Sequence, residues 1–121
     1  MIGPDTIRDA VNADARLVAR GRHVDAVLLM RVGEEAWRLD IRRGRIDAAA
    51  RGPFTMPAST FRVTAAAEEW AAFWRSVPAP GHHDLFAMMK RRALTVDGDL
   101  HPFMANLFYF KAVLATPRGM G

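Results

Sequence analysis

The most regular pattern in the chain is an alternation of apolar and polar residues over positions 37–42, which read Trp-Arg-Leu-Asp-Ile-Arg. A period of two predicts a strand with one buried face and one face in water. Positions 24–32 alternate in a similar way, and the turn residues at 33–35 predict that the two strands form a β-hairpin. Two shorter runs, at 45–49 and 61–64, predict further strands.

Apolar residues recur at helical spacing in four other segments. The first predicted helix covers residues 4–20 and the second covers 66–75. A third, whose first residue is a capping aspartate, covers 84–92. A long last helix begins at Asp99. Between the third and the last helix, the apolar residues of positions 93–96 predict another short strand.

This order of elements predicts one α+β domain over residues 1–121, with the sheet and most helices in 24–115 and a loose tail over 116–121. The polar face of the sheet is expected to meet water, and helices are expected to cover its apolar face. The segment 50–59 receives no assignment, because its two prolines argue against a central strand. A chain of 121 residues can bury one sizeable core without cross-links.

Composition and charge narrow the functional classes. The chain has no cysteine, which excludes disulfides and thiolate metal sites and suits a reducing, cytoplasmic location. Its net charge is +4 and its pI is about 10.6, and nearly all of its basic residues are arginines. These charges are dispersed and are not interleaved with aromatic residues. Nucleic-acid binding is therefore not predicted, and at most a weak contact with an anionic membrane surface is. The sequence shows no signal-peptide pattern and no apolar run near the ~20 residues of a membrane span.

Potential acid–base groups gather in one part of the sequence: His82, His83, Asp84, Asp97, Asp99 and His101. Their spacing matches no zinc signature, and the two aspartates at predicted helix starts already have capping roles. The sequence therefore predicts no metal site, no cofactor and no catalytic residue. A histidine acting as a general base on an apolar substrate stays open as an alternative, because imidazole titrates near neutral pH.

Methionine and aromatic residues are concentrated in the last helices and at the end of the helix over 66–75. The predicted wall of an apolar cavity consists of Trp74, Phe86, Met88, Met89, Phe103, Met104, Leu107 and Phe108. Methionine adapts to irregular apolar shapes, so these residues suit a tolerant lipid cavity. They suit a filled core equally well, and the pattern alone leaves both interpretations open.

Four stretches of the C-terminal half follow one another in a familiar order: Phe61-Arg62-Val63-Thr64, Glu69-Trp70 with Phe73-Trp74, Pro80 to Phe86, and Leu94-Thr95-Val96-Asp97-Gly98-Asp99. In this order they resemble the sterol carrier protein type-two superfamily, especially its small bacterial members. The resemblance covers most of residues 20–115. It implies a single five-stranded, mainly antiparallel sheet with helices packed on one face, enclosing an apolar tunnel or cavity. Members of this family bind sterols, fatty acids or acyl chains and usually have no catalytic residues.

Together these features predict a non-catalytic binding or carrier domain for a lipid-like apolar ligand, such as a fatty acyl chain or a sterol. Two alternatives remain. The chain is either an accessory module with a filled core that docks on a partner enzyme, or a small enzyme that acts on an apolar substrate with a histidine base. The ligand and the choice between a monomer and a homodimer stay open. Whether the space between the last helices and the sheet is open or filled distinguishes these hypotheses, because only a carrier or an enzyme needs an open cavity.

Overall fold

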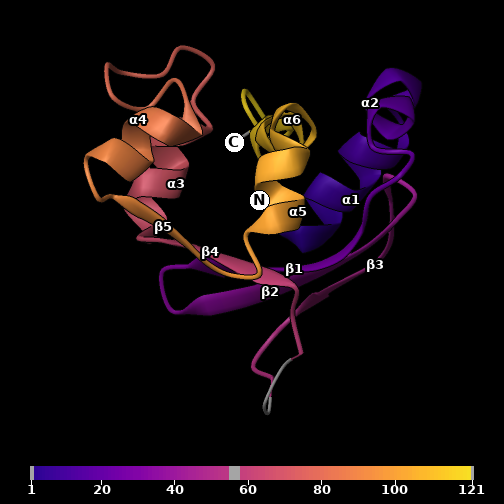
Figure 1. Cartoon of the computed structure of the whole chain (residues 1–121). Coiled ribbons are helices and arrows are strands. Elements are labelled where there is room, and N and C mark those ends of the chain that lie inside the picture. The colour runs from indigo at the N-terminus through magenta and orange to yellow at the C-terminus, as the bar shows by residue number, and fades with distance from the viewer. Residues whose placement is uncertain (1, 55–57, 121) are drawn as a thin grey trace.

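The computed structural model describes residues 2–54 and 58–120. Figure 1 shows one sheet with all of the helices on the same side of it. The strands are β1 (Asp25–Val32), β2 (Glu35–Arg42), β3 (Arg45–Arg51), β4 (Phe61–Ala65) and β5 (Leu94–Gly98). The strand order of this five-stranded sheet is β3-β2-β1-β4-β5. The strand β4 runs parallel to β1, and the other neighbouring pairs are antiparallel. The predicted α+β fold, with a mainly antiparallel sheet and helices on one face, is confirmed.

The hairpin of β1 and β2 follows the predicted alternation. Trp37, Leu39 and Ile41 are buried on the face that the helices cover, whereas Arg42 on the other face is exposed. In the antiparallel register, Leu28 of β1 lies opposite Leu39. Apolar side chains on one face of a hairpin fix its register, because a slip of one residue would turn all of them into water.

The helices are shorter than the sequence predicts. They are α1 (Pro4–Asn12), α2 (Ala15–Arg20), α3 (Ala67–Phe73), α4 (Leu85–Lys90), α5 (His101–Ala105) and α6 (Leu107–Ala115). Within the described part of the chain, no helix has both the length and the hydropathy to span a membrane.

Two helices predicted as continuous are divided. The helix expected over 4–20 ends at Asn12, and α2 begins anew after Asp14, whose side chain accepts a hydrogen bond from Leu17 N at 3.1 Å. An aspartate that caps the next helix favours a turn at this point. The last helix breaks at Asn106, where φ is −126° and ψ is 40°. The Asn106 amide there donates to Pro102 O at 3.0 Å, so its side chain bonds to the backbone of the preceding turn.

Several predicted boundaries also shift. The residues predicted as a turn at 97–98 belong to β5, and Ala50 and Arg51 from the unassigned segment extend β3. Residues 55–57 of that segment lie outside the described residues. Asp99, predicted as the cap of the last helix, accepts a hydrogen bond from His101 N at 3.2 Å, although Leu100 occupies the N-cap position of α5.

Side chains from distant elements close the edges of the core. The side-chain amide of Asn12 on α1 makes the two hydrogen bonds that a neighbouring strand would make with Ile46 of the edge strand β3. It donates to Ile46 O at 2.9 Å and accepts from Ile46 N at 2.8 Å. The segment after α6 was predicted as a loose tail, but it is bonded to α3. Arg118 Nε donates to Phe73 O at 3.0 Å, and Gly119 N donates to Trp74 O at 2.8 Å.

Tyr109 joins α6 to the turn between β2 and β3. Its buried hydroxyl donates to Gly44 O at 2.7 Å. Its ring lies against Gly21, where an added Cβ would come within 2.3 Å of the ring. Burial raises the pKa of Tyr109 above its ordinary value, because the phenolate would lose its hydration.

We predict that Tyr109 makes stability fall at alkaline pH. The unfolded chain releases the phenol proton near pH ~10, whereas the folded chain retains it. The stabilisation is therefore complete below pH ~10 and is lost as pH rises towards the higher pKa of the folded state. Chemical denaturation at several pH values should show this loss in the wild type and a shallower one in Tyr109→Phe. At neutral pH the variant should be less stable by about 1–2 kcal/mol, because Gly44 O loses its donor.

Tyr109 is the only tyrosine of the chain, so the ultraviolet absorbance of phenolate follows this residue alone. A phenolate that appears near pH 10 while the protein is still folded would contradict the assignment. Equal alkaline slopes for the wild type and Tyr109→Phe would contradict it as well.

Candidate functional site

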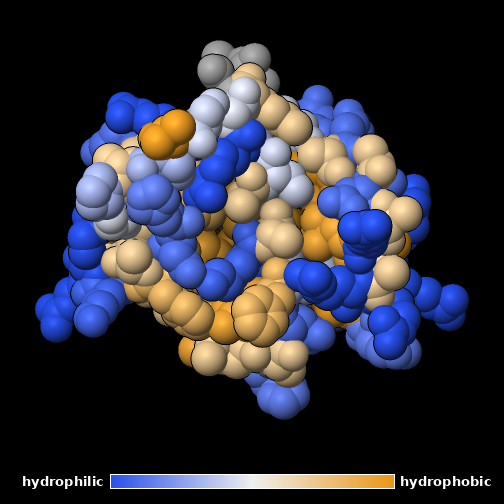
Figure 2. Space-filling model, turned by 90° about the horizontal axis from the view of Figure 1, so that it is seen from above, coloured by the Kyte–Doolittle hydropathy of each residue, from blue (hydrophilic) through white to orange (hydrophobic). Residues whose placement is uncertain are grey.

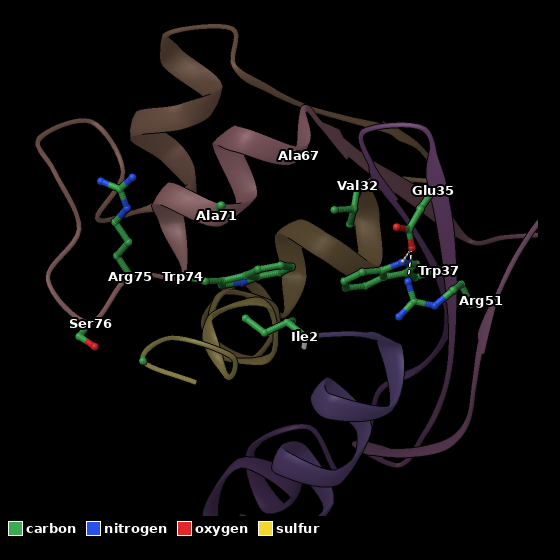
Figure 3. Close-up of a pocket in the computed structure, with 11 residues that line it drawn as sticks. Ile2, Val32, Glu35, Trp37, Arg51, Ala67, Ala71, Trp74, Arg75 and Ser76 are labelled. Atoms are coloured by element: carbon green, nitrogen blue, oxygen red, sulfur yellow. Dashed lines mark hydrogen bonds and ion pairs between the residues drawn. The ribbon is translucent and has the colours of Figure 1, made fainter. Parts of the chain in front are cut away.

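The largest of the described pockets lies between α3, the start of β2 and the C-terminal segment, with a volume of about 720 Å³. Figure 3 shows its residues. The apolar part of the wall consists of Ile2, Val32, Trp37, Ala67, Ala71 and Trp74. The remaining lining residues are Glu35, Arg51, Arg75, Ser76 and Gly119. Because several lining residues are exposed, the pocket opens to solvent, and an enclosed tunnel is not shown.

Two tryptophans form the flat floor of the pocket. Trp74 and Trp37 point towards each other from opposite sides in Figure 3, and their rings are nearly parallel, 5.9 Å apart at an angle of 9°. Trp70 packs behind Trp74 at 5.2 Å. Two of these indoles bond to main-chain carbonyls: Trp70 Nε1 donates to Arg31 O at 2.9 Å, and Trp74 Nε1 donates to Leu114 O at 2.7 Å. With these donors satisfied, the rings present only apolar surface to the pocket.

One end of the pocket is charged. Arg51 forms an ion pair with Glu35, and its guanidinium lies 5.4 Å over the Trp37 ring. The Trp37 indole donates to Glu35 Oε1 at 3.0 Å. This hydrogen bond, together with the nearby Arg51, holds the pKa of the Glu35 carboxyl below its ordinary value. Glu35 is therefore an anion at neutral pH, and it neutralises the arginine at this end.

The eight residues predicted as a cavity wall occupy three different environments. Trp74 is the one that lines the main pocket. Met88 and Phe103 are buried in the core between helices and sheet, with 0% and 1% of their surface exposed, and Met89 is half-buried against that core. These side chains therefore pack in the core and do not line a ligand cavity.

The other predicted wall residues lie at the outer surface of the helices. Leu107 and Phe108 line a separate hollow of about 550 Å³ together with Arg20. Met104, Phe108 and Phe86 are exposed, with 55%, 73% and 38% of their surface accessible. Helical spacing cannot reveal this outcome, because the break at Asn106 interrupts the stripe that the spacing assumes.

The histidines and aspartates that gather between positions 82 and 101 of the sequence have separate partners in the structure. Asp84 pairs with Lys111 Nζ at 2.7 Å and Asp97 pairs with Arg62 at 2.6 Å, and neither pair includes a histidine. His101 is exposed at the start of α5. Over the described ranges, no group of three or more His, Cys, Asp or Glu residues could hold a metal ion.

His82 instead belongs to a small network with α3. Its Nε2 lies 2.7 Å from Glu69 Oε2, and Arg91 approaches the same carboxylate at 3.4 Å. Hydrogen bonds from Arg91 and His82 lower the pKa of Glu69. These residues are absent from the lining of the main pocket, and the network ties the α3–α4 connection to both helices.

Sequence reasoning did not predict the residues at the charged end of the pocket. Glu35 begins β2 and Arg51 ends β3, and no sequence motif joins them. Trp37 gave a partial signal, because its place on the buried face of a strand was predicted but its role in a pocket was not.

The chain matches no family model and no curated protein. Its fold is that of sterol carrier protein 2, whose crystal structure matches with a TM-score of 0.76 and 13% identity over 95% of this chain and 92% of the other. UbiJ-SCP2, a ubiquinone synthesis protein, matches with a TM-score of 0.60 and 16% identity over 92% and 88%. Palmitated SCP2L2 from Aedes aegypti matches with a TM-score of 0.54 and 17% identity over 90% and 93%. The predicted resemblance is thus confirmed at the level of the fold.

We predict that the Glu69 network stabilises the protein at neutral pH but not in acid. A carboxyl with a lowered pKa contributes stability above its unfolded pKa of ~4.3, and the contribution is lost as pH falls through the folded value. Glu69→Gln should therefore lower the melting temperature at pH 7, and the difference from the wild type should shrink below pH ~4.

Glu68→Gln is the matched control, because Glu68 shares the first turn of α3 and is exposed. Both changes weaken the interaction with the helix dipole equally. If the two variants melt at the same temperature at pH 7, the network with His82 and Arg91 contributes nothing.

Proposed function

We propose that this chain is a non-catalytic binding or carrier domain for an apolar, lipid-like ligand, and that the pocket beside Trp37 and Trp74 holds it. The observation that carries the proposal is the pocket itself. It has about 720 Å³ of space, apolar walls from the sheet and α3, and charged side chains at its ends. A concave apolar site with few polar groups is the usual form of a small-molecule site.

The fold supports this proposal. Sterol carrier protein 2 and palmitated SCP2L2 share the arrangement of the sheet and helices, and the second is a protein with a bound fatty acyl group by its name. A fatty acyl chain, a sterol or a similar molecule is therefore the proposed class of ligand. The lack of cysteine fits work in a reducing cytoplasm.

The arrangement of the histidines favours a carrier over an enzyme. A histidine base would have to reach the ligand within hydrogen-bonding distance. Neither His82 nor His101 lines the pocket, and His82 is engaged by Glu69. The proposal therefore assigns no catalytic residue. An accessory role beside a partner enzyme is the second candidate, and the shared fold of UbiJ, a ubiquinone synthesis protein, favours it.

Of the predicted wall residues, Trp74 is retained in the proposed site. Trp37, Val32 and Ala71 join it as contacts for the apolar body of the ligand. Arg51 and Glu35 bound one end, where a polar group of the ligand would meet the charged pair instead of the indoles.

We predict that Ala71→Phe blocks ligand binding. Ala71 lines the pocket and is exposed, so a larger side chain would fill ligand space without disturbing the core. The ligand would then lose apolar contact with the pocket wall equivalent to the burial of one apolar side chain. This loss should weaken binding roughly tenfold or more. Titration with a fluorescent fatty acid and a fluorescent sterol measures this effect. All three tryptophans of the chain lie in one stacked group at the pocket, so energy transfer from them reports binding.

Ala19→Phe is the matched control, since Ala19 is an exposed helical alanine on α2, away from the pocket lining. It should bind as tightly as the wild type. Native mass spectrometry of freshly purified protein provides a second readout, because a co-purified lipid adds mass in the wild type and not in Ala71→Phe. If the wild type shows no saturable binding of any apolar probe and no added mass, the carrier proposal is wrong.

A further inference from the structure

The polar side chains of the main pocket lie at two opposite ends of it. Glu35 and Arg51 stand at one end in Figure 3, and Arg75 and Ser76 stand at the other. Among the described residues that line the pocket, those between the two ends are apolar, and the indole N–H groups among them are engaged within the protein. A ligand that fills the pocket therefore meets polar groups only at its own two ends.

Charged side chains near apolar surface are common on this molecule. Figure 2, which views the helical side from above, shows hydrophobic side chains with hydrophilic ones around the edge. A charge beside apolar surface therefore does not identify a binding site by itself. The two ends of the pocket are informative for another reason: they face each other across one apolar floor, and one of them is neutral whereas the other is cationic.

The end formed by Glu35 and Arg51 has no net charge but keeps hydrogen-bonding atoms available. Glu35 Oε1 accepts from Trp37 Nε1 at 3.0 Å and forms the ion pair with Arg51 Nη1. Within the described part of the chain, Glu35 Oε2 and Arg51 Nη2 make no hydrogen bond. One acceptor and one donor are thus available to a ligand at this end.

A hydroxyl group matches this neutral end, because a hydroxyl both donates and accepts hydrogen bonds. It would donate to Glu35 Oε2 and accept from Arg51 Nη2. A carboxylate would instead meet the negative charge of Glu35, whose pKa lies below its ordinary value, and an ammonium group would meet the positive charge of Arg51. Since opposed like charges weaken binding, this end selects an uncharged group.

The opposite end of the pocket carries positive charge that no acid neutralises. Arg75 is exposed just after α3 and forms no ion pair with any described residue. Arg118 brings a second guanidinium to this end of α3, where it donates to Phe73 O at 3.0 Å and so neutralises a carbonyl that would repel an anion. Ser76 adds a hydroxyl donor. Cationic and neutral donors together favour an anionic group such as a carboxylate here.

We propose that the pocket selects a ligand with two different polar ends: a carboxylate that Arg75 holds and, across an apolar body, a hydroxyl that Glu35 and Arg51 hold. This inference rests on the proposed function and names the class of ligand for the same pocket. A fatty acid that carries a hydroxyl at the far end of its chain has this chemistry. Selectivity then comes from the two end groups, whereas the indole floor tolerates changes in the apolar body.

Competition against a fluorescent fatty acid tests the proposal with the full chain. Plain fatty acids, ω-hydroxy fatty acids and dicarboxylic acids are compared at each of several chain lengths. Once the chain is long enough to reach both ends of the pocket, the ω-hydroxy acid should bind roughly tenfold more tightly than the plain acid, as expected for hydrogen bonds to charged groups. The dicarboxylic acid should bind less tightly than the ω-hydroxy acid, because its second carboxylate meets Glu35.

Glu35→Gln should reverse this order of ligands. Without the negative charge, Arg51 is free to pair with the second carboxylate, so the dicarboxylic acid should become the tighter ligand by roughly tenfold. Glu34→Gln is the matched control, because Glu34 is exposed beside Glu35 but does not line the main pocket. It should keep the preference for the ω-hydroxy acid. A reversed preference cannot result from a loss of stability alone.

Arg75→Gln tests the anionic end. It should weaken the binding of plain and ω-hydroxy acids roughly threefold, as expected for the loss of an exposed ion pair, and should leave the binding of an α,ω-diol of the same length unchanged. Arg75→Lys keeps the charge and should keep most of the affinity. Arg42→Gln makes the same change as Arg75→Gln on the exposed face of the sheet, and should bind all of these ligands like the wild type.

Three results would overturn this inference and leave the carrier proposal intact, because the fluorescent fatty acid would still bind. One is equal affinity for plain and ω-hydroxy acids at every chain length. Another is the same order of ligands in Glu35→Gln as in Glu34→Gln, and the third is an equal effect of Arg75→Gln and Arg42→Gln on the acids. If the fluorescent fatty acid and the other apolar probes show no saturable binding, the carrier proposal itself fails.

Discussion

The parallel pairing of β1 with β4 is the constraint on which the pocket depends. Val32 lies opposite Ala65 in this pair, so both strands end at the same edge of the sheet. The turn after β1 and the helix after β4 are therefore brought together, and Gly33 N donates to Ala65 O at 3.0 Å. Gly33 has a φ of +64°, and an added Cβ would come within 3.2 Å of Ala67. The start of β2 and the start of α3, which supply opposite walls of the pocket, meet because of this pairing.

The helix α3 shows how one short segment serves both the core and the pocket. Trp70 and Phe73 are buried, whereas Ala67 and Ala71 line the pocket. Hydrogen bonds from Trp70, in the middle of α3, to β1 and from Trp74, at its C-terminal end, to α6 hold the helix in place. Ala67 and Ala71 leave space on the pocket side of α3 because their side chains are small. Trp70 and Phe73 are packed in the core on the other side of the helix and do not fill this space.

The sequence predicted those features that depend on local pattern. The alternation at Trp37, Leu39 and Ile41 specified a half-buried strand, and Asp84 was expected to cap a helix, as it does through Phe86 N at 2.9 Å. The division of the first helix depends on Asp14, because an aspartate at this position caps a new helix and does not continue the preceding one. The order of the elements predicted the α+β class, and the resemblance of the C-terminal stretches to the sterol carrier family implied the five-stranded sheet with helices on one face.

The position of the pocket could not be predicted in the same way. Its wall combines residues from both ends of the chain and the middle, and the C-terminal segment becomes a wall through main-chain bonds at Gly119 that carry no side-chain signal. The cavity predicted around Met104 and Phe108 assumed that the last helix keeps one apolar face turned inward. The break at Asn106 divides that face, so part of the stripe is core and part is surface.

The distribution of hydrogen-bond donors explains what kind of recognition the pocket can provide. All three indole N–H groups are engaged within the protein, by Glu35, Arg31 O and Leu114 O. The floor of the pocket therefore offers contact area but no donors, and polar contacts are available only from charged or hydroxyl side chains such as Arg51, Arg75 and Ser76. A pocket of this kind distinguishes ligands by shape and apolar area, and an extra methylene changes affinity only modestly. A carrier that accepts related lipids needs this tolerance, whereas an enzyme that selects one substrate needs fixed polar groups along the ligand.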